Sequence, residues 1–174
     1  RMSSIIKVDQ IQLADGSTPT AGDLGMNTTG NILQVVQGTS TAGTTTTSQS
    51  FTDTGLSASI TPTSTSSKVL VIVSHPSTGV VTATSASDRV RLRLVRGSTA
   101  ITGMANLSCY TNSTTRATDT VTTTYLDSPS TTLATTYKTQ FCNEGSGCEV
   151  IVNWNAFDST PAAPSTLTLI EIAG

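Results

Sequence analysis

Three arginines spaced two residues apart, Arg89, Arg91 and Arg93, are the side chains best arranged for chemistry. Residues two positions apart in an extended strand point to the same face, and the residues between these arginines are aliphatic. One strand face would therefore carry three guanidinium groups. Such a stripe can bind an anionic glycan, a lipopolysaccharide phosphate or acidic residues of a neighbouring subunit. It is also typical of a solvated strand face whose charges prevent edge-to-edge aggregation, and the pattern leaves these alternatives open.

Two aromatic residues near the C-terminal end form a second candidate binding feature. Trp154, the sole tryptophan, closes a segment expected to be a strand, and Phe157 lies in the loop beyond it. Exposed aromatic rings can stack on sugar rings, which would make this pair a platform for a glycan. The alternative is an anchor in the core or in a subunit interface.

Motifs for catalysis are missing from the sequence, which has no GxSxG, P-loop or HExxH pattern. The single histidine, His75, leaves no credible catalytic triad, and we expect it to be a hydrogen-bonded residue at a strand end. The acidic residues are scattered over different expected strands, so neither a glycosidase pair nor a calcium loop stands out. The sequence therefore predicts a protein that is not an enzyme and that needs no cofactor or metal.

The composition favours strands as the elements that position these residues. Of the 174 residues, 36% are hydrophobic and only 11% are charged, and Ser and Thr make up roughly a third. Few charged, long side chains are available for amphipathic helices, whereas β-branched threonine suits a pleated sheet. The formal net charge of -2 gives no reason to expect nucleic-acid binding, and no apolar run is long enough for a membrane span.

Alternating and apolar segments recur at the spacing of a β-sandwich or jelly roll. They are expected at 32–37, 51–61, 68–73, 88–96, from 100 onward, 105–110, 119–126, 133–142, 149–154 and 167–172.

The segments at 51–61 and 68–73 carry the clearest predictions. The first alternates apolar and polar residues, which predicts a strand with one wet face. The second is continuously apolar, which predicts a strand covered on both faces and ended by His75-Pro76. Residues 38–50 are expected to be a surface loop or the fringe of an edge strand, and 77–87 a loop.

Several phrases of the chain resemble a β-rich domain of fibre and virion-surface proteins of tailed bacteriophages, particularly marine ones. They are NILQVVQG at 31–38, TGLSASITPTSTSSKVLVIVS at 54–74 and STLTLIEIAG at 165–174. The opening phrase SSIIKVDQIQLADGSTPTAGDLGMN at 3–27 resembles N-terminal segments of the same proteins. The resemblance implies a structural or host-recognition role without catalysis.

From this resemblance we expect an all-β, jelly-roll-like sandwich in the tail fibre or knob of a phage particle. Its partners would be further copies of itself, in a trimer, other virion proteins, and a glycan or protein of the host surface. A capsid decoration or head-fibre protein is the alternative. A carbohydrate-active enzyme is a third possibility, which the missing acid/base pair disfavours. The chain opens Arg1-Met2 without a signal peptide, so we expect assembly into virions in the host cytoplasm.

An N-terminal arm, residues 1–28, is expected to precede a sandwich domain at 29–174. The arm carries the apolar residues Ile5, Ile6, Val8, Ile11 and Leu13. It can be a docking segment that binds another virion protein or subunit, or simply the first strand and its loop.

Three cysteines complete the candidate residues. Cys142 and Cys148 flank a short Gly-rich turn, where they could pair if their Cα atoms lie about 5.5 Å apart. Cys109 is left over. Because we expect assembly in the cytoplasm, reduced thiols are the favoured state and a 142–148 disulfide is the alternative.

Overall fold

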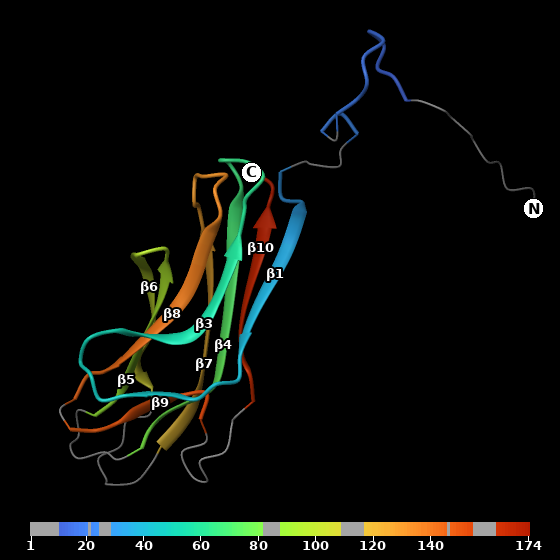
Figure 1. Ribbon diagram of the computed structural model, residues 1–174. Coiled ribbons are helices and arrows are strands. Elements are labelled where there is room, and N and C mark those ends of the chain that lie inside the picture. Colours follow the sequence, from blue (N-terminus) through green and yellow to red (C-terminus); the bar gives the residue numbers. More distant parts are fainter. Residues whose placement is uncertain are drawn as a thin grey trace, which may run out of the picture.

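The computed structural model describes residues 11–20, 22–24, 29–81, 88–108, 117–145, 147–154 and 163–174. Over these residues the chain forms ten strands and no helix. The strands make two antiparallel sheets, one of six strands and one of four, which pack face to face (Figure 1). The predicted all-β sandwich is therefore confirmed.

Each sheet takes strands from the whole length of the chain. Sheet A contains β1 (Ile32–Ser40), β2 (Thr44–Thr46), β4 (Lys68–Val80), β7 (Ala117–Asp127), β9 (Val150–Val152) and β10 (Ser165–Ile172). Sheet B contains β3 (Thr52–Ile60), β5 (Val90–Arg96), β6 (Thr99–Ser108) and β8 (Thr135–Asn143). In sheet A, β4 has β7 along one edge and β10 followed by β9 along the other. The order in sheet B is β3-β8-β5-β6.

The strand pairs are nested along the chain. β1 pairs with β10, β3 with β8, β4 with β7, and β5 with β6. Successive pairs lie alternately in sheet A and sheet B, so the chain is a long antiparallel ribbon rolled into a sandwich. The ribbon turns back between β5 and β6, where Gly97 has a φ of 57° that suits glycine. This nesting places β5 beside β8, far from it in sequence.

The alternation of β3 and β5 is borne out. Leu56, Ala58 and Ile60 of β3 are buried, whereas Ser57 and Ser59 are exposed. In β5, Leu92 and Leu94 are buried whereas Arg91 and Arg93 face away from the core. Period-two patterning therefore identified the wet and dry faces of sheet B correctly.

Strand β4 corrects two predictions. It continues through His75-Pro76 to Val80, so residues 77–80 are strand and not loop. Ile72 is 39% exposed although Val71 and Val73 are fully buried, so the strand is not covered on both faces. Among the described residues, no layer packs on the outer face of sheet A, and the continuous apolar run reflects an apolar outer surface.

The Thr-rich stretch at 38–50 contributes to the sheet edge, the second of the two alternatives. β1 extends to Ser40, and Thr44–Thr46 forms β2, which pairs with β9. β-branched threonine is compatible with this position because it suits an extended backbone.

The core consists of two clusters of buried side chains between the sheets. The first contains Leu56, Ala58, Ile60, Val69, Val71, Val73, Leu94, Tyr137, Leu167 and Leu169. The second contains Val80, Val90, Leu92, Val121, Phe141, Cys148, Val150 and Val152.

A chain of hydrogen-bonded polar side chains, here called the polar bridge, lies between these clusters, and Met104 packs against both of them. On β4, His75 places Nδ1 2.8 Å from Ser165 Oγ and Nε2 3.0 Å from Thr139 Oγ1. Thr139 Oγ1 lies 2.6 Å from Thr54 Oγ1 of β3, and Ser165 donates a hydrogen bond to Asn153 Oδ1. The bridge thus links sheet B to sheet A. His75 is hydrogen-bonded as predicted, but in the middle of a strand and not at its end.

Candidate functional site

The three arginines of the predicted stripe share one surface of sheet B. Arg91 and Arg93 belong to β5, which lies between β6 and β8, and Arg89 directly precedes this strand. All three side chains are partly exposed. The structure therefore brings the predicted stripe together in the middle of a sheet, where neighbouring strands supply partners.

Glu144, just after β8, is the anionic partner of the first two arginines. Arg89 Nε lies 2.8 Å from Glu144 Oε2, and Arg91 Nε lies 3.6 Å from the same oxygen. The hydrogen bond from Arg89 lowers the pKa of Glu144. Two cations thus share one carboxylate, and Arg91 is the more distant of the two.

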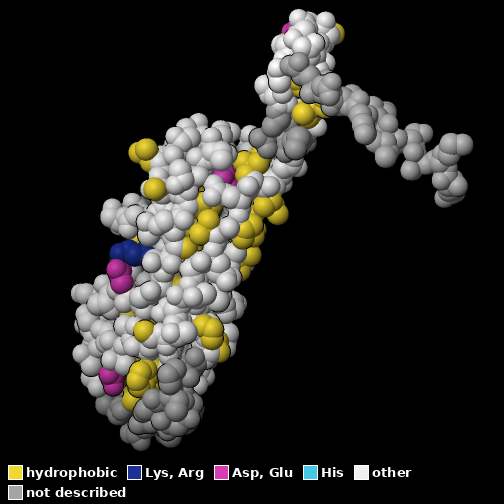
Figure 2. Space-filling view, turned by 45° about the vertical axis from the view of Figure 1, so that its right-hand side comes forward, with side chains coloured by type: hydrophobic (Ala, Val, Ile, Leu, Met, Phe, Trp, Pro, Cys, Tyr) yellow, Lys and Arg dark blue, Asp and Glu magenta, His cyan; other side chains and the backbone are white. Residues whose placement is uncertain are grey.

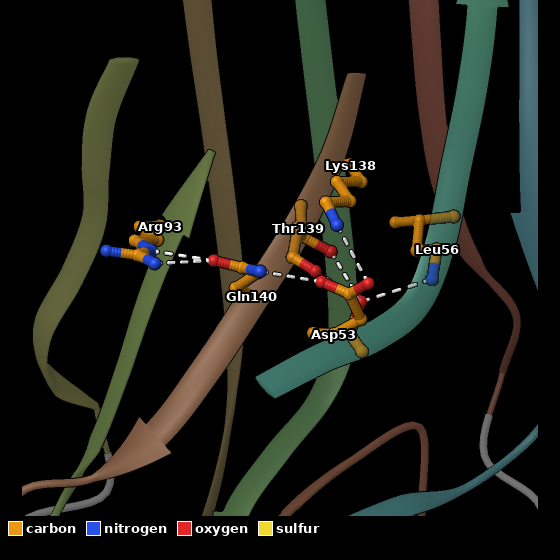
Figure 3. Close-up of polar contacts among 7 residues, drawn as sticks. Asp53, Leu56, Arg93, Lys138, Thr139 and Gln140 are labelled. Atoms are coloured by element: carbon orange, nitrogen blue, oxygen red, sulfur yellow. Dashed lines mark hydrogen bonds and ion pairs between the residues drawn. The ribbon is translucent and has the colours of Figure 1, made fainter. Parts of the chain in front are cut away.

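Arg93 is held by a neutral side chain. Its Nε and Nη2 donate to Gln140 Oε1 at 2.9 and 2.7 Å. Gln140 in turn donates to Asp53 Oδ1 at 2.7 Å, and Lys138 donates to Asp53 Oδ2 at 2.8 Å (Figure 3). Hydrogen bonds from Lys138 and Gln140 lower the pKa of Asp53. A continuous polar row therefore runs across β5, β8 and β3.

The ring of Phe51, just before β3, contacts the guanidinium groups of Arg91 and Arg93. The Arg93 guanidinium carbon lies 4.0 Å from the centroid of the Phe51 ring, and that of Arg91 lies 5.6 Å away. Both distances are within the range of a cation–π contact. Stacking of this kind holds a guanidinium group in place while leaving its edge donors available.

A shallow depression of about 260 Å³ lies beside these groups. Phe51, Arg91, Leu92 and Arg93 line it together with residues 100–103 of β6, and we call it the basic groove. Gly103 pairs with Arg93 across the two strands. Because glycine has no side chain, the groove stays open opposite Arg93.

The polar residues of this surface leave an excess of positive charge. Among the residues that the structure describes on this surface, four cationic side chains, Arg89, Arg91, Arg93 and Lys138, lie near two carboxylates, Asp53 and Glu144. The chain as a whole has a formal net charge of -2, so this local excess is set against an acidic molecule.

The structure describes one of the two residues of the predicted aromatic platform. Trp154 is half-buried, and a Cβ built on Gly43 would lie 1.7 Å from its ring atom Cε3. The indole therefore packs directly on the backbone between β1 and β2, which covers part of its surface. Phe157 lies outside the described residues.

The predicted arm is described only from Ile11 onward. Ile11 and Leu13 are exposed, and Ile5, Ile6 and Val8 lie outside the described residues. Leu13 N donates to Ser17 O within a turn of the same segment. Residues 11–20 are drawn clear of the two sheets (Figure 1).

The cysteines do not form the hairpin pair that a disulfide would need. Cys142 lies at the end of β8 in sheet B, and Cys148 just before β9 in sheet A. Both are buried free thiols, and burial raises the pKa of each. Cys109 lies outside the described residues.

Sequence reasoning missed the partners of the stripe, above all Phe51, Gln140 and Glu144. Alternation around Gln140 placed its side chain on the wet face of its strand, but only the pairing of β5 with β8 brings it to Arg93. Phe51 gave no signal, since it stands alone at the start of a strand.

No known family model matches the chain, and no curated protein matches it. Within the part of the chain that the structure describes, no long apolar helix of the kind that crosses a bilayer is present. The same residues contain no group of three or more His, Cys, Asp or Glu side chains able to hold a metal ion.

Proposed function

We propose that the chain is a non-enzymatic structural domain on the surface of a tailed-phage particle, part of an oligomeric fibre or knob with a role in host recognition. The resemblance of its sequence to phage fibre and virion-surface proteins points to the particle. The observation that carries the proposal is the nested order of the strands. β1 pairs with β10, and the other strand pairs lie successively inside this pair as far as the β5–β6 turn. This is the arrangement of a rolled antiparallel ribbon.

A jelly-roll topology is part of this proposal. Jelly rolls are two-sheet sandwiches common in viral capsid proteins and lectin domains. Strand order β1-β10-β4-β7 on one sheet and β3-β8-β5-β6 on the other supports this topology. The short strands β2 and β9 prolong β1 and β10 and do not alter the order.

Association with further copies of the chain is supported by the outer face of sheet A. Seven aliphatic side chains gather on it from four adjacent strands, and we call them the apolar face. They are Ile32, Val35, Leu70, Ile72, Leu126, Ile170 and Ile172. Hydrophobic side chains are visible along the side of the molecule that carries β1 (Figure 2).

The register shows that this face is continuous. Val35 pairs with Ile170, Ile170 with Leu70, and Leu70 with Leu126, which makes one aliphatic row across the sheet. Contiguous apolar patches on a protein surface mark interaction sites. In the neighbouring row Ile72 pairs with Thr168 and Thr124, which are uncharged, whereas Lys68 pairs with Ile172 at one end of the face and places a single positive charge there.

Replacing Ile72 and Leu126 together with lysine is expected to reduce the oligomer, a trimer by resemblance, to monomers. Both side chains are exposed, so the change introduces repulsion without emptying the core. Light scattering coupled to size-exclusion chromatography measures the mass. Leu133→Lys is the matched control, because Leu133 is exposed but lies in the loop before β8. An unchanged mass for the double variant would rule out the apolar face as the contact.

Immunogold electron microscopy tests the location. Antibodies raised against residues 29–174 are expected to label intact particles of the phage that encodes the chain. Gold along the tail fibres supports the fibre assignment, whereas gold over the shell supports the alternative of a capsid decoration or head-fibre protein. Particles that carry no label, while the infected-cell lysate contains the protein, would refute a virion role.

A further inference from the structure

We infer that the basic groove binds an acidic polysaccharide, with the Arg91 guanidinium as the main contact to its carboxylate or sulfate groups. This inference rests on the proposed function in host recognition and names the ligand class and the residues.

Arg91 has unused hydrogen-bonding capacity. Its Nε is 3.6 Å from Glu144 Oε2, too far for a direct hydrogen bond, whereas Arg89 Nε lies 2.8 Å from the same oxygen. The Arg91 side chain is 42% exposed and borders the groove. A guanidinium group has five N–H donors in a planar fork that matches an acidic oxygen pair. Arg91 can therefore offer such a fork to a ligand.

Arg93 is prearranged for the same role. Gln140 receives hydrogen bonds from Nε and Nη2, and Phe51 lies 4.0 Å from the guanidinium carbon, so the side chain is held on two sides. Nη1 is not used in these contacts and remains for a ligand. Because the group is already ordered, less conformational entropy is lost when a ligand binds.

The spacing of the two arginines suits a ligand whose acidic groups recur. Arg91 and Arg93 stand two positions apart on β5, which places their Cα atoms about 6.6 Å apart. The far side of the groove is lined by Ala100, Ile101, Thr102 and Gly103, of which only Ile101 is bulky. It can therefore receive an extended chain along the strand direction.

Carboxylates at the margins favour a polysaccharide over an acidic protein segment. Asp53 is 53% exposed and Glu144 is partly exposed on the same surface. An acidic group placed against either carboxylate would meet repulsion, whether it belongs to a peptide or to a polysaccharide. Sugar hydroxyls can instead donate hydrogen bonds to these oxygens while the acid group of the sugar meets Arg91.

Calorimetric titration with polygalacturonate tests the inference. Wild-type protein is expected to bind it, and to bind fully methyl-esterified polygalacturonate, which has the same backbone without charge, at least tenfold more weakly. Affinity should fall steeply with added salt. A second pair of titrations compares the binding of dextran sulfate with that of uncharged dextran. It distinguishes recognition of sulfate groups from recognition of carboxylates.

Arg91→Gln is expected to weaken binding about tenfold or more, since it removes a charge-assisted pair. Lys68→Gln is the matched control: it removes one positive charge from the other sheet and should change affinity less than twofold. Arg91→Lys keeps the charge but loses the fork, so it should bind between wild type and Arg91→Gln.

Three results would overturn the inference: no binding of either polyanion by folded wild-type protein, equal losses from Arg91→Gln and Lys68→Gln, or a lower oligomer mass for Arg91→Gln. The last would make the groove a contact to acidic residues of a neighbouring subunit. These failures are separable from failure of the proposed function, because particles labelled by the antibody would still place the chain on the virion.

Discussion

Replacing Leu169 with alanine is expected to lower the free energy of unfolding by about 2–5 kcal/mol. Leu169 is fully buried in β10, where it pairs with Val71 and with Val36 and belongs to the first core cluster. The shorter side chain leaves a cavity between the two sheets, which close-packed neighbours can fill only in part. Urea denaturation followed by fluorescence measures the loss.

Ile72→Ala is the matched control for this prediction. Ile72 lies on β4, the strand beside β10, and points to the outer face with 39% of its surface exposed. Its truncation is expected to cost about 1 kcal/mol or less, because part of the side chain is already in water. The comparison is repeated over a tenfold range of protein concentration to separate association from folding. Equal losses for the two variants would contradict the assignment of faces in sheet A.

Local alternation predicted the fold where one face of a strand is wet. The period of two matches the buried positions from Thr54 to Ile60 in β3 and from Val90 to Leu94 in β5, and Val95, which is also buried, departs from it. It failed in β4 because a continuous apolar run has two causes that look alike in sequence. A strand can be covered by other layers of its own chain, or its outer face can be an apolar surface. Ile72 and Leu70 are of the second kind.

Pro76 shows why the end of β4 could not be predicted. Proline lacks the N–H that a ladder requires, so it normally ends a central strand. Here the register between β4 and β7 shifts between His75 and Thr78, and Pro76 sits within this irregularity. A bulge of this kind leaves a residue out of the ladder and lets the strand continue. No local feature of the sequence predicts this bulge.

The candidate site was predictable in its cations but not in their environment. Alternation alone placed Arg91 and Arg93 on one face of β5. Their partners come from β8 and from the start of β3, which are distant in sequence and become neighbours only through the nested pairing. Such contacts depend on topology, which residue patterns specify only weakly.

The polar bridge has a defined direction of hydrogen bonding. Asn153 donates its amide N–H to Ser40 O, so its Oδ1 must accept from Ser165. The Ser165 hydroxyl proton is then used, and His75 Nδ1 must carry a proton to donate to Ser165 Oγ. A neutral ring leaves Nε2 as the acceptor of the Thr139 hydroxyl. Neutral His75 therefore fits the bridge in a single tautomer.

A second proton on His75 would break this arrangement. Protonated Nε2 would point a donor at the Thr139 hydroxyl and would force the Thr139–Thr54 bond to reverse. It would also place a charge in the middle of the core, far from water. Burial accordingly lowers the pKa of His75 from 6.5 to about 4.

Stability is expected to fall by about 3 kcal/mol as the pH is lowered from about 6.5 to about 4. In this window the unfolded chain binds a proton at His75 and the folded chain does not, so protons favour unfolding. Above about pH 6.5 His75 is neutral in both the folded and the unfolded state, and below about pH 4 it is protonated in both. Outside this window His75 therefore does not contribute to the change of stability with pH. Asp53, Glu144 and Glu171 have lowered pKa values, so their stabilisation is lost mainly at lower pH.

Urea denaturation at a series of pH values measures how the free energy of unfolding changes with pH. In the His75→Gln variant this change is expected to be smaller between about pH 6.5 and 4, whatever the absolute stability of the variant. Because the chain has one histidine, a single imidazole resonance in the NMR spectrum reports its titration in the folded wild type, even if the variant does not fold. The resonance should titrate near 4. Titration near 6.5, the value of a solvent-exposed histidine, would mean that the bridge opens to water and that no dry polar layer lies between the two core clusters.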